Sequence, residues 1–165
     1  MSRKDFLHVN KFSVIIEMKN RVLASNACVN SLISVPPEGW VHIKLNSLLP
    51  HCRVVSGTQF VRDSLLRLIN EISFDGVKLP FFRKAFLGII EFCPRDVSDV
   101  FDHDNKGFKA VQNVLKGRLF PDDDCFELSL GLFTELRNES CCHIYVLPDD
   151  EAGIFTDMRL SHELG

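Results

Sequence analysis

The sequence predicts an α+β domain in which two helices pack on a small mixed β-sheet. From residue 40 onward, the periodic segments follow the order strand, helix, strand, helix, strand, strand. Of the 165 residues, 45% are hydrophobic and 25% are charged, which is the average for globular domains. The chain contains neither an internal repeat nor a low-complexity tract. Its length fits one domain of ordinary size.

Four segments are typical of strands. Val41, Ile43 and Leu45 alternate with polar residues, the period-two pattern of a half-buried strand. Residues 84–93 are apolar on nearly both faces, as in a central strand. The third segment is a second alternating run at residues 126–132. The fourth is the apolar segment at residues 143–147, which follows a turn and predicts a returning strand.

Two segments are typical of helices. Val61, Leu65 and Leu68 recur at intervals of four and three, which describes one face of an amphipathic helix. The second helix is expected at roughly residues 105–116, and Gly117 is a common residue at a helix end.

The chain is expected to divide at two places. Pro36-Pro37-Glu38-Gly39 interrupts regular structure, so residues 1–39 are interpreted as an N-terminal extension of unknown role. Residues 40–148 then form the folded domain. Residues 149–165 are acidic and lack sustained periodicity, which predicts a flexible tail.

Charge is distributed unevenly along the chain, although its net value is only −3. Residues 40–118 contain twelve basic and eight acidic side chains, whereas residues 119–165 contain two basic and eleven acidic ones. The net charge therefore does not exclude a surface that binds phosphate.

A cytoplasmic protein without a membrane segment is expected. The chain shows no secretory signal, and no run approaches the roughly 18 apolar residues that span a bilayer. The six cysteines are scattered without a regular framework, which favours reduced thiols.

Two acidic segments are candidates for a metal site. Asp102-His-Asp104-Asn105 follows the buried strand, and Asp122-Asp123-Asp124 precedes the next one. Carboxylate oxygens bind hard cations, and a bound metal can activate water and offset phosphoryl charge. If the two strands are neighbours in the sheet, we expect the segments to meet at one end. The alternative is that these residues cap helices and form turns, which Asp and Asn favour.

Cys141-Cys142-His143 is a second, weaker candidate for metal ligands. These residues open a predicted strand, and the chain lacks the paired CxxC spacing of zinc sites. Packing in the interior is therefore the favoured interpretation.

The stretch from Asp102 to Asp124 resembles the signature of RusA-type endodeoxyribonucleases. That signature is a DxDN motif, a lysine about one turn later, a helix ending near Leu-X-Gly, and an Asp-Asp pair before a strand. The matching elements cover roughly Trp40 to Leu147. The resemblance implies a small α+β nuclease domain at residues 40–148 that acts as a homodimer with Mg²⁺, for which Mn²⁺ can substitute. Such enzymes hydrolyse phosphodiesters in four-way (Holliday) DNA junctions during recombination and repair.

The resemblance also implies roles for individual residues. Asp102, Asp104 and Asp123 would hold the metal, with Asp122 as the nearest competitor of Asp123. Lys109 would stabilise developing negative charge. The family lysine lies three residues after the asparagine, where this chain has Phe108, so Lys109 is one residue late and Lys106 is the other candidate.

Two rival functions follow from these departures and from the acidic tail. The first is a RusA-fold module that binds branched DNA or a protein partner without cutting. The second is an interaction protein whose acidic segments are only turns. A tight Mn²⁺ or Mg²⁺ site that is lost on mutation of Asp102, Asp104 or Asp123 would support an active centre, and the absence of such a site would support the interaction protein.

Overall fold

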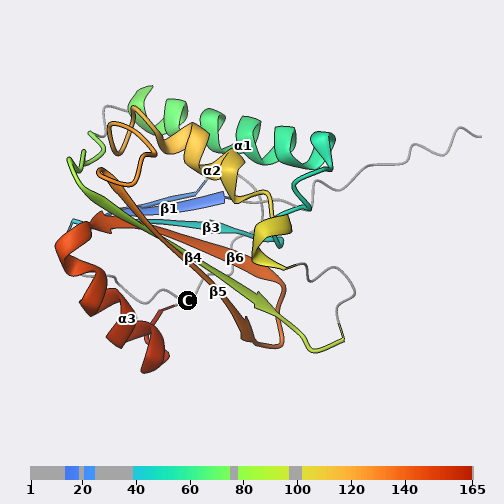
Figure 1. Cartoon of the computed structure of the whole chain (residues 1–165). Coiled ribbons are helices and arrows are strands. Elements are labelled where there is room, and N and C mark those ends of the chain that lie inside the picture. Colours follow the sequence, from blue (N-terminus) through green and yellow to red (C-terminus); the bar gives the residue numbers. More distant parts are fainter. Residues whose placement is uncertain (1–13, 19–20, 25–38, 75–77, 97–101, 165) are drawn as a thin grey trace, which may run out of the picture.

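Helices cover both faces of a six-stranded mixed sheet (Figure 1). The computed structural model describes residues 14–18, 21–24, 39–74, 78–96 and 102–164. Helices α1 and α2 lie on one face of the sheet, and α3 lies on the other (Figure 1). The predicted α+β class with a mixed sheet is therefore confirmed.

The strands run in the order β2-β1-β3-β6-β4-β5 across the sheet. Their bounds are β1 Val14–Met18, β2 Arg21–Ala24, β3 Val41–Leu45, β4 Ala85–Cys93, β5 Leu128–Leu136 and β6 Cys141–Pro148. The pairing of β4 with β5 is parallel, and the other pairs are antiparallel. The helices are α1 Val55–Phe74, α2 Phe108–Leu115 and α3 Ala152–Leu160, with single 3₁₀ turns before α2 and α3. None of the helices in the described part of the chain combines the length and apolar composition needed to cross a bilayer.

The sheet extends into the segment that was interpreted as an N-terminal extension. Strand β1 pairs with β3, joining Ile16 to Ile43, and β2 pairs with β1. The expected boundary at residue 39 is therefore wrong, because part of the preceding segment belongs to the same sheet. Pairing with β1 satisfies main-chain groups of β3 that would otherwise lie at a sheet edge.

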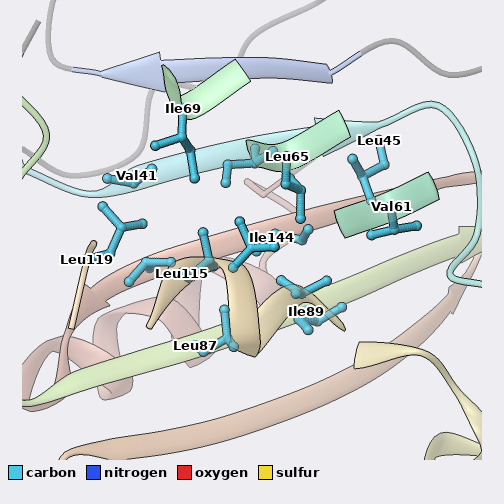
Figure 2. Packing of buried hydrophobic residues seen from close by; sticks show 14 of the residues in the cluster. Val41, Leu45, Val61, Leu65, Ile69, Leu87, Ile89, Leu115, Leu119 and Ile144 are labelled. Carbon is cyan, nitrogen blue, oxygen red and sulfur yellow. The ribbon is translucent and has the colours of Figure 1, made fainter. Parts of the chain in front are cut away.

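The main hydrophobic core lies between the sheet and the pair α1 and α2. Figure 2 shows these side chains meeting: Val41, Leu45, Val61, Leu65, Ile69, Leu87, Ile89, Leu115, Leu119 and Ile144. The helical stripe predicted at Val61, Leu65 and Leu68 is buried, as expected. Helix α2 begins at Phe108, later than expected, because the backbone at Lys106 is extended and forms a β-bridge with His51.

Helix α3 contradicts the expectation of a flexible acidic tail. Its Phe155 is fully buried and seals a second core on the opposite face of the sheet. The ring lies so close to Gly88 of β4 that an added Cβ would come within 2.5 Å of Phe155 Cζ. Only one side chain of α3 is buried. One buried side chain does not produce a periodic hydrophobic pattern, so the sequence did not indicate this helix.

Candidate functional site

The acidic turn before α2 is fixed by main-chain hydrogen bonds to the loop before α1. The carbonyl oxygen of Asn105 accepts a bond of 2.7 Å from the N–H of Cys52. The N–H of Gly107 donates to the carbonyl oxygen of Pro50 at 2.8 Å. The 3₁₀ turn His103–Asn105 is therefore attached on its C-terminal side to a second, distant segment of the chain.

A buried ion pair anchors the same turn from below. Lys106 Nζ donates to Glu91 Oε2, and both side chains are at most 4% exposed. Glu91 lies on the face of β4 that carries Leu87 and Ile89, and its Oε1 accepts a bond of 2.6 Å from the N–H of Leu49. Lys106, the alternative functional lysine, therefore points into the interior. Sequence reasoning missed Glu91, although a lone carboxylate in an apolar strand was the available signal.

Asp102 and Asp104 present exposed carboxylates at the start of this turn. Within the described residues, neither side chain has a hydrogen bond or an ion pair. Asp102 is the N-cap residue of the 3₁₀ turn but makes no side-chain capping bond, and the N-cap of α2 is Gly107. The capping interpretation does not hold for these two residues. His103 between them is 3.2 Å from Thr134 Oγ1 of β5.

Asp123 lies beside α2 and contacts two lysines, one on the helix and one at its C-terminal end. Its Oδ2 is ion-paired with Lys109 Nζ, and its Oδ1 is 3.0 Å from Lys116 Nζ. These bonds, from Lys109 first and Lys116 second, hold the pKa of the Asp123 carboxyl well below its usual range. Hydrogen bonds to Asp122 and Asp123 raise the pKa of Lys116. The structure thus brings two predicted site residues, Lys109 and Asp123, into contact.

The other two aspartates of the second acidic segment form turns. Asp122 Oδ1 accepts a bond of 2.7 Å from the N–H of Asp123, and this carboxylate also pairs with Lys116. Asp124 Oδ1 accepts bonds from the N–H groups of Phe126 and Glu127 at 2.8 and 3.0 Å. The turn interpretation therefore holds for Asp122 and Asp124.

The expected meeting of the two acidic segments at one end of the sheet is wrong. Strands β4 and β5 are neighbours, as expected, but they are parallel, so that Ala85 pairs with Leu128 and Cys93 with Leu136. The end of β4 and the start of β5 consequently lie at opposite ends of the sheet. In the described part of the chain, no three His, Cys, Asp or Glu side chains form a group suited to a metal ion. The predicted ligands are therefore not gathered into one cluster there.

Cys141 and His143 lie in the second core, as the packing interpretation predicts. Cys141 Sγ is 3.4 Å from His143 Nε2, and His143 Nδ1 is 2.8 Å from His42 Nε2. Tyr145 stacks on His42 with ring centroids 4.3 Å apart. Burial raises the pKa of the Cys141 thiol to about 12. Burial, followed by the charge of His42, lowers the pKa of His143 to about 2. A protonated thiol and a neutral imidazole suit an interior network.

Comparison with known proteins gives one family and no function. None of the curated proteins compared matches the chain. Residues 14–158 match a family of unknown function, and this stretch includes β1, both acidic segments and most of α3. The chain belongs to this family, DUF6100.

Proposed function

We propose that the protein is a Mg²⁺-dependent endodeoxyribonuclease that cuts four-way DNA junctions as a homodimer. The observation that supports this proposal best is the Lys109–Asp123 ion pair. The pair joins α2, which follows the first acidic segment, to the second acidic segment, although the end of β4 and the start of β5 lie at opposite ends of the sheet. Lys109 and Asp123 are the residues to which the resemblance to RusA-type nucleases assigns charge stabilisation and metal binding.

The carboxylates present fit a hard divalent cation in their chemistry. Asp102 and Asp104 are exposed, and neither carboxylate is used for capping or in a described ion pair. Carboxylate oxygens are the ligands that hard divalent cations prefer, and these two aspartates lie two residues apart at one exposed turn. Asp123 has its charge balanced by Lys109 and Lys116, so it would join the ligand set after exchanging an ammonium group for the cation.

The chain's own residues would then act in two ways. Asp102 and Asp104 would hold the cation, which when bound supplies positive charge beside the scissile phosphodiester and activates water. Asp123 would complete the ligand set only by moving from its pair with Lys109 toward the acidic turn. Lys109, released from Asp123, would donate to a phosphate oxygen and stabilise the charge that develops there. Phosphoryl transfer asks for positioning and electrostatic stabilisation more than for covalent chemistry. The main-chain bonds and the Lys106–Glu91 pair hold the acidic turn in place for that task.

A second candidate is a module that binds branched DNA or a protein partner without cutting. The observation that favours it is the engagement of Asp123 by two lysines, together with its separation from the other two predicted ligands. In this function the acidic turn and the lysines would serve recognition only. The remaining candidate is an interaction protein whose acidic segments are only turns. It agrees with Asp122 and Asp124 but gives no role to the carboxylates of Asp102 and Asp104, which have no partner among the described residues.

The decisive experiment compares Asp104→Asn with Asp157→Asn. Both changes remove one carboxylate charge from an exposed side chain, but Asp157 lies on α3, across the sheet from the candidate site. We expect wild-type protein and Asp157→Asn to cut a synthetic four-way junction in Mg²⁺ or Mn²⁺. Asp104→Asn should bind the junction equally well or more tightly, because a negative charge facing phosphate is gone. Its cleavage rate should fall by orders of magnitude.

Three other results would redirect the assignment. Junction binding by the wild type without cutting in either metal would favour the non-cutting module. A fully active Asp104→Asn protein would remove Asp104 from the metal site. The absence of both junction binding and a Mn²⁺ site in calorimetry would favour an interaction protein. A cytoplasmic location and a role in recombination or repair belong to the same proposal.

A further inference from the structure

A polar groove lies between α1 and α2, next to the candidate site. It has a volume of about 240 Å³ and is lined by Cys52, Thr58, Gln59, Arg62, Gly107, Lys109, Ala110 and Asn113. Since a water molecule takes up about 30 Å³, this space holds a phosphodiester group with several waters. The lining contains two cationic side chains and no acidic one.

Arg62 is the side chain that distinguishes this groove from an ordinary seam between helices. It is exposed on α1, and within the described residues its guanidinium has neither a hydrogen bond nor an ion pair. Lys109 stands on the α2 side of the groove and is held by Asp123 outside the lining. Gln59 and Asn113 add amide groups from the two walls, although Gln59 is bonded at 2.8 Å to Asp63. An unpaired guanidinium in a hollow is suited to a planar, bidentate anion such as a phosphodiester.

The backbone favours an anion in the same place. Gly107, the N-cap residue of α2, is part of the lining and supplies no capping side chain. The first N–H groups of a helix lack partners within the helix, and the helix dipole is positive there. Gly107 also cannot accept a bulkier residue cheaply, because an added Cβ would come within 3.0 Å of the Pro50 carbonyl oxygen. The loop before α1 and Thr58 therefore pack directly against Gly107.

We propose that this groove is the seat for a backbone phosphate of the bound DNA strand, with Arg62 as its principal side-chain contact. This inference rests on the proposed function in naming DNA as the ligand. Arg62 would not touch the reacting atoms but would position the strand, so that the neighbouring phosphodiester lies by Lys109 and the acidic turn. Such a contact adds affinity without reading sequence.

Cys52 offers a local probe of the groove. It is an exposed free thiol in the lining, whereas Cys125 is an exposed free thiol outside it. A strand seated in the groove should therefore slow alkylation of Cys52 by N-ethylmaleimide. Peptide mass spectrometry distinguishes the two cysteines, and Cys125 reports any general shielding of the protein by DNA.

The test compares Arg62→Gln with Arg83→Gln in EDTA, where no cleavage occurs. Both changes remove one exposed positive charge, and Arg83 lies outside the groove. A fluorescent four-way junction is titrated with each protein over a range of salt concentrations. Relative to Arg83→Gln, we expect Arg62→Gln to bind the junction about tenfold more weakly at low salt. The plot of log K against log salt should also be less steep for Arg62→Gln, its negative slope smaller in magnitude by about one. At saturating junction, Cys52 should be protected in the wild type and in Arg83→Gln, and exposed again in Arg62→Gln.

Any of three results would overturn the inference. The first is equal affinity and equal salt slope for the two variants. The second is alkylation of Cys52 at the same rate with and without junction. The third is protection of Cys52 by inorganic phosphate but not by DNA, which would make the groove a small-anion site. Because binding and alkylation are measured without metal, the inference can stand even if the wild type does not cut DNA. It can equally fail while cleavage and the Asp104 result support the nuclease.

Discussion

Lys106 and Glu91 form an ion pair in the interior, between the turn before α2 and the central strand β4. The pair explains why two lysines three residues apart have different surroundings. Lys106 is drawn inward with an extended backbone, and Lys109 is left on the surface of α2. The acidic turn is therefore attached to β4 by a buried ion pair on the side of the sheet that α1 and α2 cover.

Removing one member of that pair should be costly. Lys106→Met leaves the Glu91 carboxylate buried without its cation, and we expect the free energy of unfolding in urea to fall by about 3–5 kcal/mol. Combining it with Glu91→Gln removes both charges and keeps an acceptor for the Leu49 N–H. The double variant should recover part of the loss. Lys109→Met, at an exposed pair, is the control and should change stability little. Equal stability of Lys106→Met and the wild type would contradict the buried pair.

Helix α3 should be part of the folded domain. Phe155→Ala leaves a cavity over Gly88, and we expect it to lower the unfolding free energy by about 3–5 kcal/mol. Ile154→Ala changes an exposed neighbour and should have a small effect. Ending the chain after Leu147 should likewise destabilise the protein in thermal or urea denaturation. A truncated protein as stable as the full chain would show that the second core does not depend on α3.

Stability should fall in mild acid because of His143. The pKa of His143 in the folded protein is lowered from 6.5 to about 2. Below pH 6.5, this imidazole therefore binds a proton in the unfolded chain but stays neutral in the folded one. The contribution of His143 is complete above pH 6.5 and declines by about 1.4 kcal/mol for each pH unit below it. Urea denaturation between pH 5 and 6.5 measures this slope before most carboxylates titrate. His143→Gln should flatten it, whereas His162→Gln, at an exposed position, should not. Parallel slopes in all three proteins would count against a neutral buried imidazole.

Lys116 should compete with a cation for the second acidic segment. It pairs with both Asp122 and Asp123, so Lys116→Gln should tighten Mn²⁺ binding, by at most about fivefold because these pairs are only partly buried. Lys78→Gln removes an exposed charge elsewhere and serves as the control. Isothermal titration calorimetry gives both affinities. If the two variants bind Mn²⁺ equally, Asp123 is not a ligand.

The active nuclease should be a homodimer. A four-way junction presents two equivalent strands, and paired cuts require two active sites related by a two-fold axis. Light scattering at micromolar concentration should give twice the chain mass of 18.8 kDa. A monomer that cuts junctions symmetrically would rule out this arrangement.

Most of the fold was predictable because periodicity directly reports one-sided burial. The alternation at Val41 to Leu45 and the spacing of Val61, Leu65 and Leu68 placed β3 and α1 correctly, and the apolar run placed β4. Helix α3 could not be predicted this way, because Phe155 is its only buried side chain. Strand β1 was missed for a related reason, since a run of five residues does not separate strand from helix.

The candidate site was predictable only in part. The sequence was sufficient to identify both acidic segments and the lysine of α2, because residue types and spacing are local properties. It could not decide the direction in which β5 pairs with β4, and that direction separates the ends of the two strands. It also could not decide which lysine is buried. That depends on Glu91, which faces the helix side of the sheet and lies close enough to pair with Lys106.

The sequence by itself determined the α+β class, the main helices and strands, and the positions of Asp102, Asp104, Asp123 and Lys109 along the chain. These follow from local periodicity and residue chemistry, which need no knowledge of distant contacts. Only the tertiary structure decided that Asp123 contacts Lys109, that Lys106 is buried, and that Arg62 of α1 stands beside α2 in one groove. Each of these relations joins segments that are separate in sequence, and it exists only because packing of the helices on the sheet brings those segments together.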